Sequence, residues 1–531
     1  MRSREMPLWL ILFLVCVALC LLYNVTDFDI WARLAVGKLF FELGHVSPRD
    51  IFAYTPTKPL WVDHEWGSGV VFFLTADACG QKGLLGLRLL CYFGTIVLVH
   101  LVIRERMEKP TSLLFHLVLA KALLFGFAVT VRSQVFTYLF FSLWFYLLER
   151  ARRGKSRALL LLPVSMVVWA NLHGGFLSGL GLLLIYGTGE FLNRRPWKIY
   201  GLLFVLCSLA TLLNPYGVAY WRYLHEAVLL PRILISEWRP TDFCSPIRLV
   251  FEFKILFLLT LLLLAGSAVA RRKQDWTQVI LLLVTGYLAV RHVRHTTFFD
   301  ISCAPFLYGH LRRGWRFWAG RAETWFPTAP RQKFESIAAR GQAVLHGLLV
   351  AALALVMISL PVRVDIPESD LPVGAVRFIR QNHLQGNLLL PFTWGNFAIW
   401  ELYPACRVAS DGRYEEVYAE GTFRDIHRFV AGRRGWEQVL NKYPHELILI
   451  PRASRISPAM KDQRNWALVY QDDFSELYLP AAHPRREWVL PDRGSDRDDP
   501  FSTQGLDRVL PACPPRSGGT GFPNRDSRRR G

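Results

Sequence analysis

The sequence predicts a polytopic α-helical membrane protein with a small α/β domain after its last membrane span. Of the 531 residues, 52% are hydrophobic and 20% are charged. The apolar residues form blocks of the length that a membrane-spanning helix needs. Residues 255–270, for example, contain no charged side chain. The sequence therefore excludes an ordinary soluble globular protein.

The net charge of +20 would suggest a nucleic-acid partner in a soluble protein. Here much of the basic surplus lies in short segments between apolar blocks, which is typical of cytoplasmic loops. The nine cysteines form no CxxC pair and no zinc-binding spacing with histidine. We therefore expect no nucleic-acid partner, no disulfide framework and no zinc site.

About eleven apolar blocks approach the length of about 20 residues that one membrane span needs. The first block follows MRSRE without a small-x-small cleavage site, so we interpret it as a retained span and not as a signal peptide. The expected spans are residues 7–23, 84–103, 111–130, 133–149, 157–171, 175–192, 199–214, 250–270, 276–291, 296–311 and 342–361.

The lysines and arginines between the spans predict the sides of the membrane. With a cytoplasmic N-terminus, the cytoplasmic segments hold 23 of these residues and the opposite loops before the last span hold 12. This bias follows the positive-inside rule. It places residues 24–83, residues 215–249 and everything after residue 361 outside the cytoplasm.

The first outer loop is expected to form two amphipathic helices. Each lies between an acidic residue that can cap its start and a glycine that can end it. The first presents a continuous apolar surface and is expected to lie on the membrane. The two helices are residues 30–43, between Asp29 and Gly44, and residues 64–79, between Asp63 and Gly80.

The chain is expected to divide into a transmembrane domain (1–361), an extracytoplasmic α/β domain (362–480) and a disordered tail (481–531). Helical periodicity at 373–381 precedes short apolar runs that are typical of strands. The tail is rich in proline, glycine, arginine, aspartate and serine and has few large apolar residues. The strand-like runs are residues 387–390, 446–450 and 466–470.

Polar side chains that membrane topology does not require gather on the outer side, beginning with Asp27 and Asp29. In an extended segment these two carboxylates would share a side and face one divalent cation or one hydroxyl group. In a helix they would diverge by about 200°. The alternative interpretation is that Asp29 caps the following helix and Asp27 is solvated.

Further candidates follow on the same side. His64 and Glu65 would open the second amphipathic helix, where a glutamate is also favourable against the helix dipole. The RHVRH sequence at 291–295 carries arginine side chains suited to phosphate oxygens, or to anionic lipid headgroups. The other outer polar residues are Arg132, Gln134, Asn171, His173, Asn214 and Glu237.

This arrangement resembles the GT-C superfamily of membrane glycosyltransferases. The strings "DFDIWARLAVGKLFFELGHVSPRDIFAYT", "VDHEWGSGV", "WANLHGGF", "NPYG", "EWRP" and "RHVRH" are similar to a group of bacterial multi-pass proteins assigned to that superfamily. The resemblance covers most of residues 20–310. It extends more loosely to 370–480 through "TWGNFAIWELYP" and "SDGRYE". The relatives tend to carry a tryptophan and a histidine where this chain has Ala32 and Arg33.

The resemblance implies an inverting glycosyltransferase of a bacterial plasma membrane. It would move a hexose or pentose from a polyprenyl-phosphate donor to a glycan, lipid or protein acceptor at the outer face, among membrane lipids. The implied base is Asp27, supported by Asp29 and Glu65, and Mg²⁺ or Mn²⁺ would bind at Asp27 and Asp29. The implied donor-phosphate contacts are Arg132, Arg291 and Arg294, and the substrate contacts are His64, Gln134, Asn171, His173, His292 and His295.

Two other functions remain open. A transporter or flippase of a lipid-linked saccharide would use the same basic residues, but such proteins usually show internal repeats with polar groups near the bilayer midplane. This sequence shows no such repeat, and its polar residues gather at one surface. A scaffold for cell-envelope assembly is the second alternative.

Overall fold

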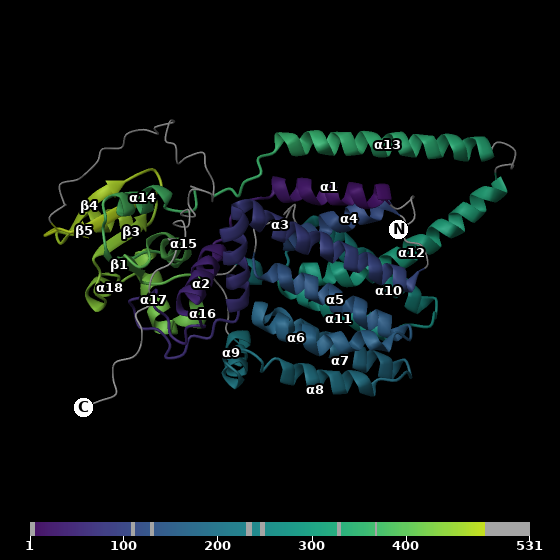
Figure 1. The fold of residues 1–531 in the computed structure, drawn as a ribbon, viewed down its shortest axis with the longest axis horizontal. Coiled ribbons are helices and arrows are strands. Elements are labelled where there is room, and N and C mark those ends of the chain that lie inside the picture. The colour runs from purple at the N-terminus through teal and green to yellow at the C-terminus, as the bar shows by residue number, and fades with distance from the viewer. Residues whose placement is uncertain are drawn as a thin grey trace, which may run out of the picture.

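The computed structural model describes residues 6–107, 112–127, 132–229, 236–244, 250–325, 331–366 and 369–483. The described part consists of a long helical bundle and a C-terminal α/β domain at one end of it (Figure 1). Nearly all of the tail predicted from residue 481 lies outside the described residues.

Helices form the bundle because its sequence is a series of apolar blocks whose backbone polar groups must be satisfied within each segment. Helix α13 runs beside α1 along one side of it (Figure 1). The helices outside the C-terminal domain are α1 (Met6–Leu22), α2 (Asp29–Leu43), α3 (Trp66–Arg106), α4 (Leu113–Leu123), α5 (Gln134–Arg152), α6 (Leu161–Leu172), α7 (Leu177–Leu192), α8 (Lys198–Ala210), α9 (Val218–Leu229), α10 (Phe251–Val269), α11 (Trp276–Arg291), α12 (Thr296–Trp325) and α13 (Arg331–Ser359).

A helix occupies each of the eleven apolar blocks, but eleven membrane spans are not confirmed. Within the described residues, three helices are long and apolar enough to cross a membrane: Trp66–Arg106, Gly174–Leu192 and Phe251–Val269. Six further apolar helices are 10–17 residues long, shorter than most single spans. The helix positions were therefore predictable, whereas the number of crossings was not.

Helix α3 joins the second amphipathic helix to the second expected span. Its backbone leaves the helical conformation at Gly80, with φ 58° and ψ −153°. Only glycine adopts this conformation at little cost. The end predicted at Gly80 is therefore a kink, and the chain continues from it directly into the bundle.

Helix α2 ends as expected, with Gly44 in the left-handed conformation (φ 74°). Its surroundings differ from the prediction of a helix lying on a membrane. It packs between α3 and α15 (Phe392–Leu402) of the C-terminal domain, so that even Arg33 is only 3% exposed. Close packing against α3 is possible because Gly37 has no side chain; a Cβ at this position would overlap the carbonyl oxygen of Gly69.

The C-terminal domain contains a five-stranded mixed sheet in the order β2-β1-β3-β5-β4. The first three strands are parallel, and β5 pairs antiparallel with β3 and β4. The sequence indicated β1, β3 and β4 but not β2 or β5. The strands are β1 (Gly386–Leu389), β2 (Cys406–Val408), β3 (Leu447–Pro451), β4 (Trp466–Gln471) and β5 (Ser475–Pro480), and the other helices are α14 (Val373–Gln381), α16 (Tyr414–Val417), α17 (Glu420–Val430), α18 (Glu437–Lys442) and α19 (Ile456–Lys461).

The segment between α2 and α3 is built into the C-terminal domain. Ala53 bridges to Val408 at the edge of the sheet. Asp50 accepts a 2.6 Å hydrogen bond from the buried Arg413, whose guanidinium also lies 4.8 Å from the Trp61 ring centroid. Because these contacts fix the segment that leads into α3, the C-terminal domain positions the residues described next.

Candidate functional site

One cluster forms around Arg132, which precedes α5 at the end of the bundle nearest the C-terminal domain. The Arg132 Nε lies 2.8 Å from Asp27 Oδ2, and Nη2 lies 3.3 Å from Asp29 Oδ2. The third guanidinium nitrogen, Nη1, donates to Glu237. We call Asp27, Asp29, Arg132 and Glu237 the Arg132 cluster. Three segments that lie far apart in the sequence meet at this one cation.

Within this cluster, Asp27 carries a carboxyl group that can exchange a proton near neutral pH. Burial raises its pKa to about 7, against the lowering influence of Arg132, and the nearby charges of Asp29 and Glu237 raise it further. For Glu237, burial raises the pKa, but Arg132 and Arg294 outweigh burial and hold it below its usual value. The Asp27 carboxyl is therefore about half ionised at neutral pH.

The two aspartates do not match either sequence interpretation completely. Asp27 is buried, and its Oδ1 accepts a 2.8 Å hydrogen bond from the backbone N–H of Asp29. Asp29 is the first residue of α2 and not its cap, and its side chain is 46% exposed. Both carboxylates nevertheless face one positive group, as the extended arrangement predicted, but that group is the Arg132 guanidinium.

The arrangement does not fit a divalent cation at Asp27 and Asp29. Their Oδ2 atoms are directed at Arg132, which also binds Glu237. Among the described residues, no group of three or more histidines, cysteines, aspartates or glutamates is placed to hold a metal ion. Mg²⁺ and Mn²⁺ prefer several oxygen ligands, and here the candidate oxygens are engaged by the guanidinium.

A second cluster surrounds Glu65, immediately before α3. Its Oε1 lies 3.3 Å from His173 Nε2 and 3.5 Å from His64 Nε2. The other ring nitrogen of His64 lies 2.9 Å from Glu416 Oε1, which comes from α16 of the C-terminal domain. The Glu65 cluster comprises Arg33, Asp63, His64, Glu65, His173 and Glu416.

The two histidines of this cluster differ in charge. The backbone N–H of Gly175 donates to His173 Nδ1 over 2.8 Å, which assigns the ring proton to Nε2, facing Glu65. Burial lowers the pKa of His173 to about 3, so it is neutral. For His64, burial lowers the pKa, but Glu416 and Glu65 outweigh burial and raise it to about 9. His64 is therefore cationic at neutral pH.

Glu65 remains ionised throughout the physiological range. Burial raises its pKa, but the combined effect of His64, His173 and Arg33 is larger and lowers it to about 2. A carboxylate with such a low pKa is a weak base. The Glu65 cluster thus provides a fixed negative charge between two rings, whereas Asp27 can gain and lose a proton.

Arg33 links the second cluster to the fold. It pairs with Asp63 and lies 3.6 Å from Glu416 Oε2 and 3.8 Å from Glu65 Oε2. Burial lowers the pKa of the guanidinium, but these three carboxylates outweigh burial and raise it. Arg33, one of the two residues at which this chain departs from its expected relatives, is therefore an ion-pairing residue at the centre of the cluster.

Arg294 lies beside the Arg132 cluster on an aromatic support. Its guanidinium carbon is 4.6 Å from the ring centroid of Trp238, the neighbour of Glu237. Its Nη2 lies 3.5 Å from Gln134 Oε1. His292 donates from Nδ1 to the Trp238 carbonyl over 2.6 Å. These contacts position the Arg294 charge close to that of Arg132.

The remaining candidates have different surroundings. The Arg291 side chain is exposed and makes no hydrogen bond or ion pair with a described residue, so the structure does not bring it into either cluster. His295 packs 6.1 Å from Trp238, ring to ring, and burial lowers its pKa to about 3. Asn171 accepts a 2.9 Å hydrogen bond from Trp66 Nε1 and donates to the Leu213 carbonyl. Asn171, in α6, therefore ties α3 to the turn that follows α8.

Sequence reasoning missed two residues from the C-terminal domain. Glu416 belongs to the Glu65 cluster, and Asn396 of α15 donates to the Phe28 carbonyl over 3.0 Å and lies 3.5 Å from Asp29 Oδ1. Asn396 lies within the string "TWGNFAIWELYP", and Glu416 directly follows "SDGRYE". Those two motifs were the available signal.

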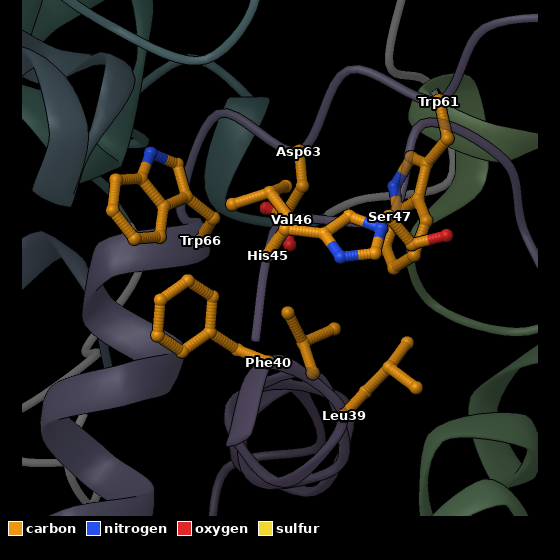
Figure 2. A pocket seen from close by; sticks show the side chains of 9 residues that line it. Leu39, Phe40, His45, Val46, Ser47, Trp61, Asp63 and Trp66 are labelled. Carbon is orange, nitrogen blue, oxygen red and sulfur yellow. The ribbon is translucent and has the colours of Figure 1, made fainter. Parts of the chain in front are cut away.

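A small pocket beside Asp63 is too small for a sugar. Figure 2 shows Leu39 and Phe40 of α2 and Trp66 of α3 among its lining residues. The space inside is about 10 Å³, which corresponds to about one water molecule. Asp63 Oδ2 is buried and has no hydrogen-bond partner among the described residues.

No protein-family model and no curated protein sequence matches this chain. Its structure is similar to that of the archaeal oligosaccharyltransferase AglB from Archaeoglobus fulgidus in complex with an inhibitory peptide and a dolichol-phosphate. The TM-score is 0.53 at 12% identity, over 91% of this chain and 75% of that one. It is also similar to the Archaeoglobus fulgidus oligosaccharyltransferase tethered to an acceptor peptide with the NVT sequon, with TM-score 0.53 at 10% identity over 83% and 69% of the two chains. At these identities the likeness concerns the fold, and the chain shares the architecture of these archaeal oligosaccharyltransferases.

Proposed function

We propose that this protein is a membrane glycosyltransferase that moves a sugar from a lipid-phosphate donor to an acceptor at the end of the bundle nearest the C-terminal domain. The observation that carries the proposal is the Arg132 cluster, in which Asp27 has a pKa of about 7. The shared fold supports it, because one similar structure contains a dolichol-phosphate and the other an acceptor peptide. In our proposal the donor lipid is a polyprenyl phosphate and this end faces away from the cytoplasm.

Asp27 acts as the general base. The acceptor nucleophile forms a bond to the anomeric carbon while the bond from that carbon to the phosphate oxygen breaks. The lipid phosphate leaves with the electron pair, and Asp27 takes the acceptor proton. A single displacement of this kind inverts the anomeric configuration. A base is most efficient when its pKa lies near the working pH, which favours Asp27 over Glu65, whose pKa is about 2.

Arg294 stabilises the leaving phosphate. An arginine fork pairs well with phosphate oxygens, and the Trp238 ring holds this fork beside the Arg132 cluster. Arg132 has a different role from the phosphate contact expected from the sequence, because Asp27, Asp29 and Glu237 already engage it. It gathers the three carboxylates and supplies the positive charge that a divalent cation would otherwise provide.

The Glu65 cluster orients the substrate. Its neutral His173 and cationic His64 flank an ionised carboxylate, so the cluster offers both hydrogen-bond donors and an acceptor for sugar hydroxyl groups. Glu416 and Asn396 bring the C-terminal domain into this arrangement. The domain therefore completes the site in this proposal.

The proposal is tested with purified full-length protein and a radiolabelled polyprenyl-phosphate sugar, using a membrane extract as the acceptor source. Asp27→Asn removes the base and is expected to reduce transfer at least about 100-fold. The matched control is Glu42→Gln, which neutralises an exposed carboxylate on the adjacent helix α2. Full activity of Asp27→Asn would show that Asp27 is not the base.

A further inference from the structure

A large basic cavity lies at the opposite end of the bundle from the two clusters. It is formed by the ends of α3 and α5, the turn between α10 and α11, and the middle of α12, and has a volume of about 840 Å³. The Glu65 cluster lies at the start of α3 and the Arg132 cluster at the start of α5. The length of these two helices therefore separates the cavity from both clusters. Nothing in the proposed transfer reaction uses it.

The inner part of this cavity is electrostatically balanced. Arg106 lies 2.8 Å from Glu149, and Arg152 lies 3.1 Å from Glu149 and 2.8 Å from Asp275. Arg152 and Glu149 are less than 10% exposed. These ion pairs are satisfied within the protein and hold α3, α5 and α11 together.

The outer part of the cavity has an excess of positive charge. Besides Arg153, five of its cationic side chains form no ion pair with any residue in the described ranges. They belong to two segments about 40 residues apart in the sequence, and the fold brings them to one hollow. These side chains are Arg272, Lys273, Arg312, Arg313 and Arg316. Positive residues in loops follow from membrane topology alone, but topology does not require them to converge on one cavity, where they repel one another.

The same cavity has an apolar side. Met107, Pro305 and Phe306 line it next to the basic groups. Beyond the cavity, α12 exposes the aromatic side chains Trp315 and Trp318, which are 76% and 62% exposed. Aromatic side chains of this kind are enriched where a membrane meets water. A ligand that fits this cavity combines negative charge with hydrocarbon.

We propose that the basic cavity binds the phosphate-containing headgroup of an anionic membrane lipid. The phosphate oxygens would occupy the region of the five cationic side chains, since arginine and lysine bind phosphate oxygens well. The glycerol and the first carbons of the acyl chains would contact Met107 and Phe306. This binding site is separate from the candidate transfer site and does not rest on the proposed function.

The test measures thermal unfolding of purified, delipidated full-length protein in detergent. Cardiolipin is expected to raise the unfolding midpoint in a saturable manner, whereas phosphatidylcholine leaves it unchanged. The triple variant Arg272→Gln/Lys273→Gln/Arg313→Gln is expected to raise the half-saturating cardiolipin concentration by about tenfold or more. Circular dichroism and size-exclusion chromatography confirm that the variant is folded.

The matched control is the triple variant Arg157→Gln/Arg194→Gln/Lys198→Gln. These side chains are exposed and outside the cavity, and the variant removes the same number of charges from the membrane side predicted for the cavity. An unchanged cardiolipin response in the control supports the proposal. An equal loss in both variants would assign the effect to diffuse surface charge and overturn it. Inorganic pyrophosphate is the third ligand, and stabilisation by it equal to that by cardiolipin would overturn the assignment of a lipid.

Discussion

Lowering the pH below 7 is expected to abolish sugar transfer progressively, because Asp27 must lose its proton before it can act as a base. Burial, together with the nearby charges of Asp29 and Glu237, raises the pKa of Asp27 from 3.8 to about 7 against the lowering effect of Arg132. At pH 5 about 1% of this carboxyl group would be ionised. An aspartate with its ordinary pKa would be more than about 90% ionised at the same pH.

The structure therefore predicts that kcat/KM falls about 100-fold between pH 8 and pH 5, with a slope of one below pH 7. The assay is the initial rate of transfer at a donor concentration below KM, in buffers of constant ionic strength. A rate that stays level down to pH 5 would refute the assignment of Asp27 as a base with a raised pKa.

Arg132 provides a second check on the same reasoning. Its positive charge lowers the pKa of Asp27 against the effect of burial. Arg132→Met is therefore expected to move the rising limb of the plot of kcat/KM against pH to higher pH. Arg132→Lys retains a positive charge and is expected to move it less. A limb that stays in place in Arg132→Met would show that the measured ionisation belongs to another group.

Three further predictions concern the site and its scaffold. Because Arg132 engages the three carboxylates, EDTA is expected to change the transfer rate of the wild type less than about twofold. Electron paramagnetic resonance is expected to detect Mn²⁺ binding by Arg132→Met, in which the carboxylates are released, but not by the wild type. Wild-type Mn²⁺ binding that Asp27→Asn abolishes would contradict this account. The pKa of His64 is raised from 6.5 to about 9, so its contribution to stability is complete below pH 6.5 and is lost as the pH rises through 9. Between pH 6.5 and pH 9 the unfolding midpoint is therefore expected to fall more steeply in the wild type than in His64→Gln. Parallel curves for the two proteins would exclude this role of His64. Gly37→Ala is expected to destabilise the protein by about 1–3 kcal/mol, because the new Cβ would overlap α3. The control is Gly86→Ala, where the new Cβ would have no neighbour within 4 Å. This control is expected to have no destabilising effect in the same thermal unfolding assay. Equal midpoints for the two variants would show that the contact between α2 and α3 is not tight.

The positions of the helices in the eleven apolar blocks could be predicted because each block is nearly continuous, whereas α9 lies in a segment that was expected only as an outer loop. The surroundings of α2 could not be predicted, since the same amphipathic pattern suits a helix on a membrane and a helix between two protein layers. In that pattern Arg33 was one of the polar residues outside the apolar surface. Only the tertiary structure shows that Arg33 pairs with Asp63 and lies 3.6 Å from Glu416.

The sequence indicated several residues of the two clusters, but it did not indicate which of them pair with one another. Asp27, Asp29 and Glu65 were identified from their place after the first span and before the next helix. The sequence assigned Arg132 to a phosphate, Asp27 to the role of base and both aspartates to a possible cation site, because each residue type was considered separately. Pairing between positions 27 and 132 depends on the packing of α2 and α5 around α3, which no local pattern contains.

The central claim is that a sugar leaves a lipid phosphate and is joined to an acceptor. Mass spectrometry of both products measures it most directly, after purified protein is incubated in vesicles with a defined polyprenyl-phosphate sugar and a membrane extract as acceptor. We predict that free polyprenyl phosphate and glycosylated acceptor form in equal amounts with the wild type and Glu42→Gln, and not with Asp27→Asn. Recovery of the intact donor on the opposite leaflet, with no glycosylated product, would contradict the claim and indicate a lipid transporter.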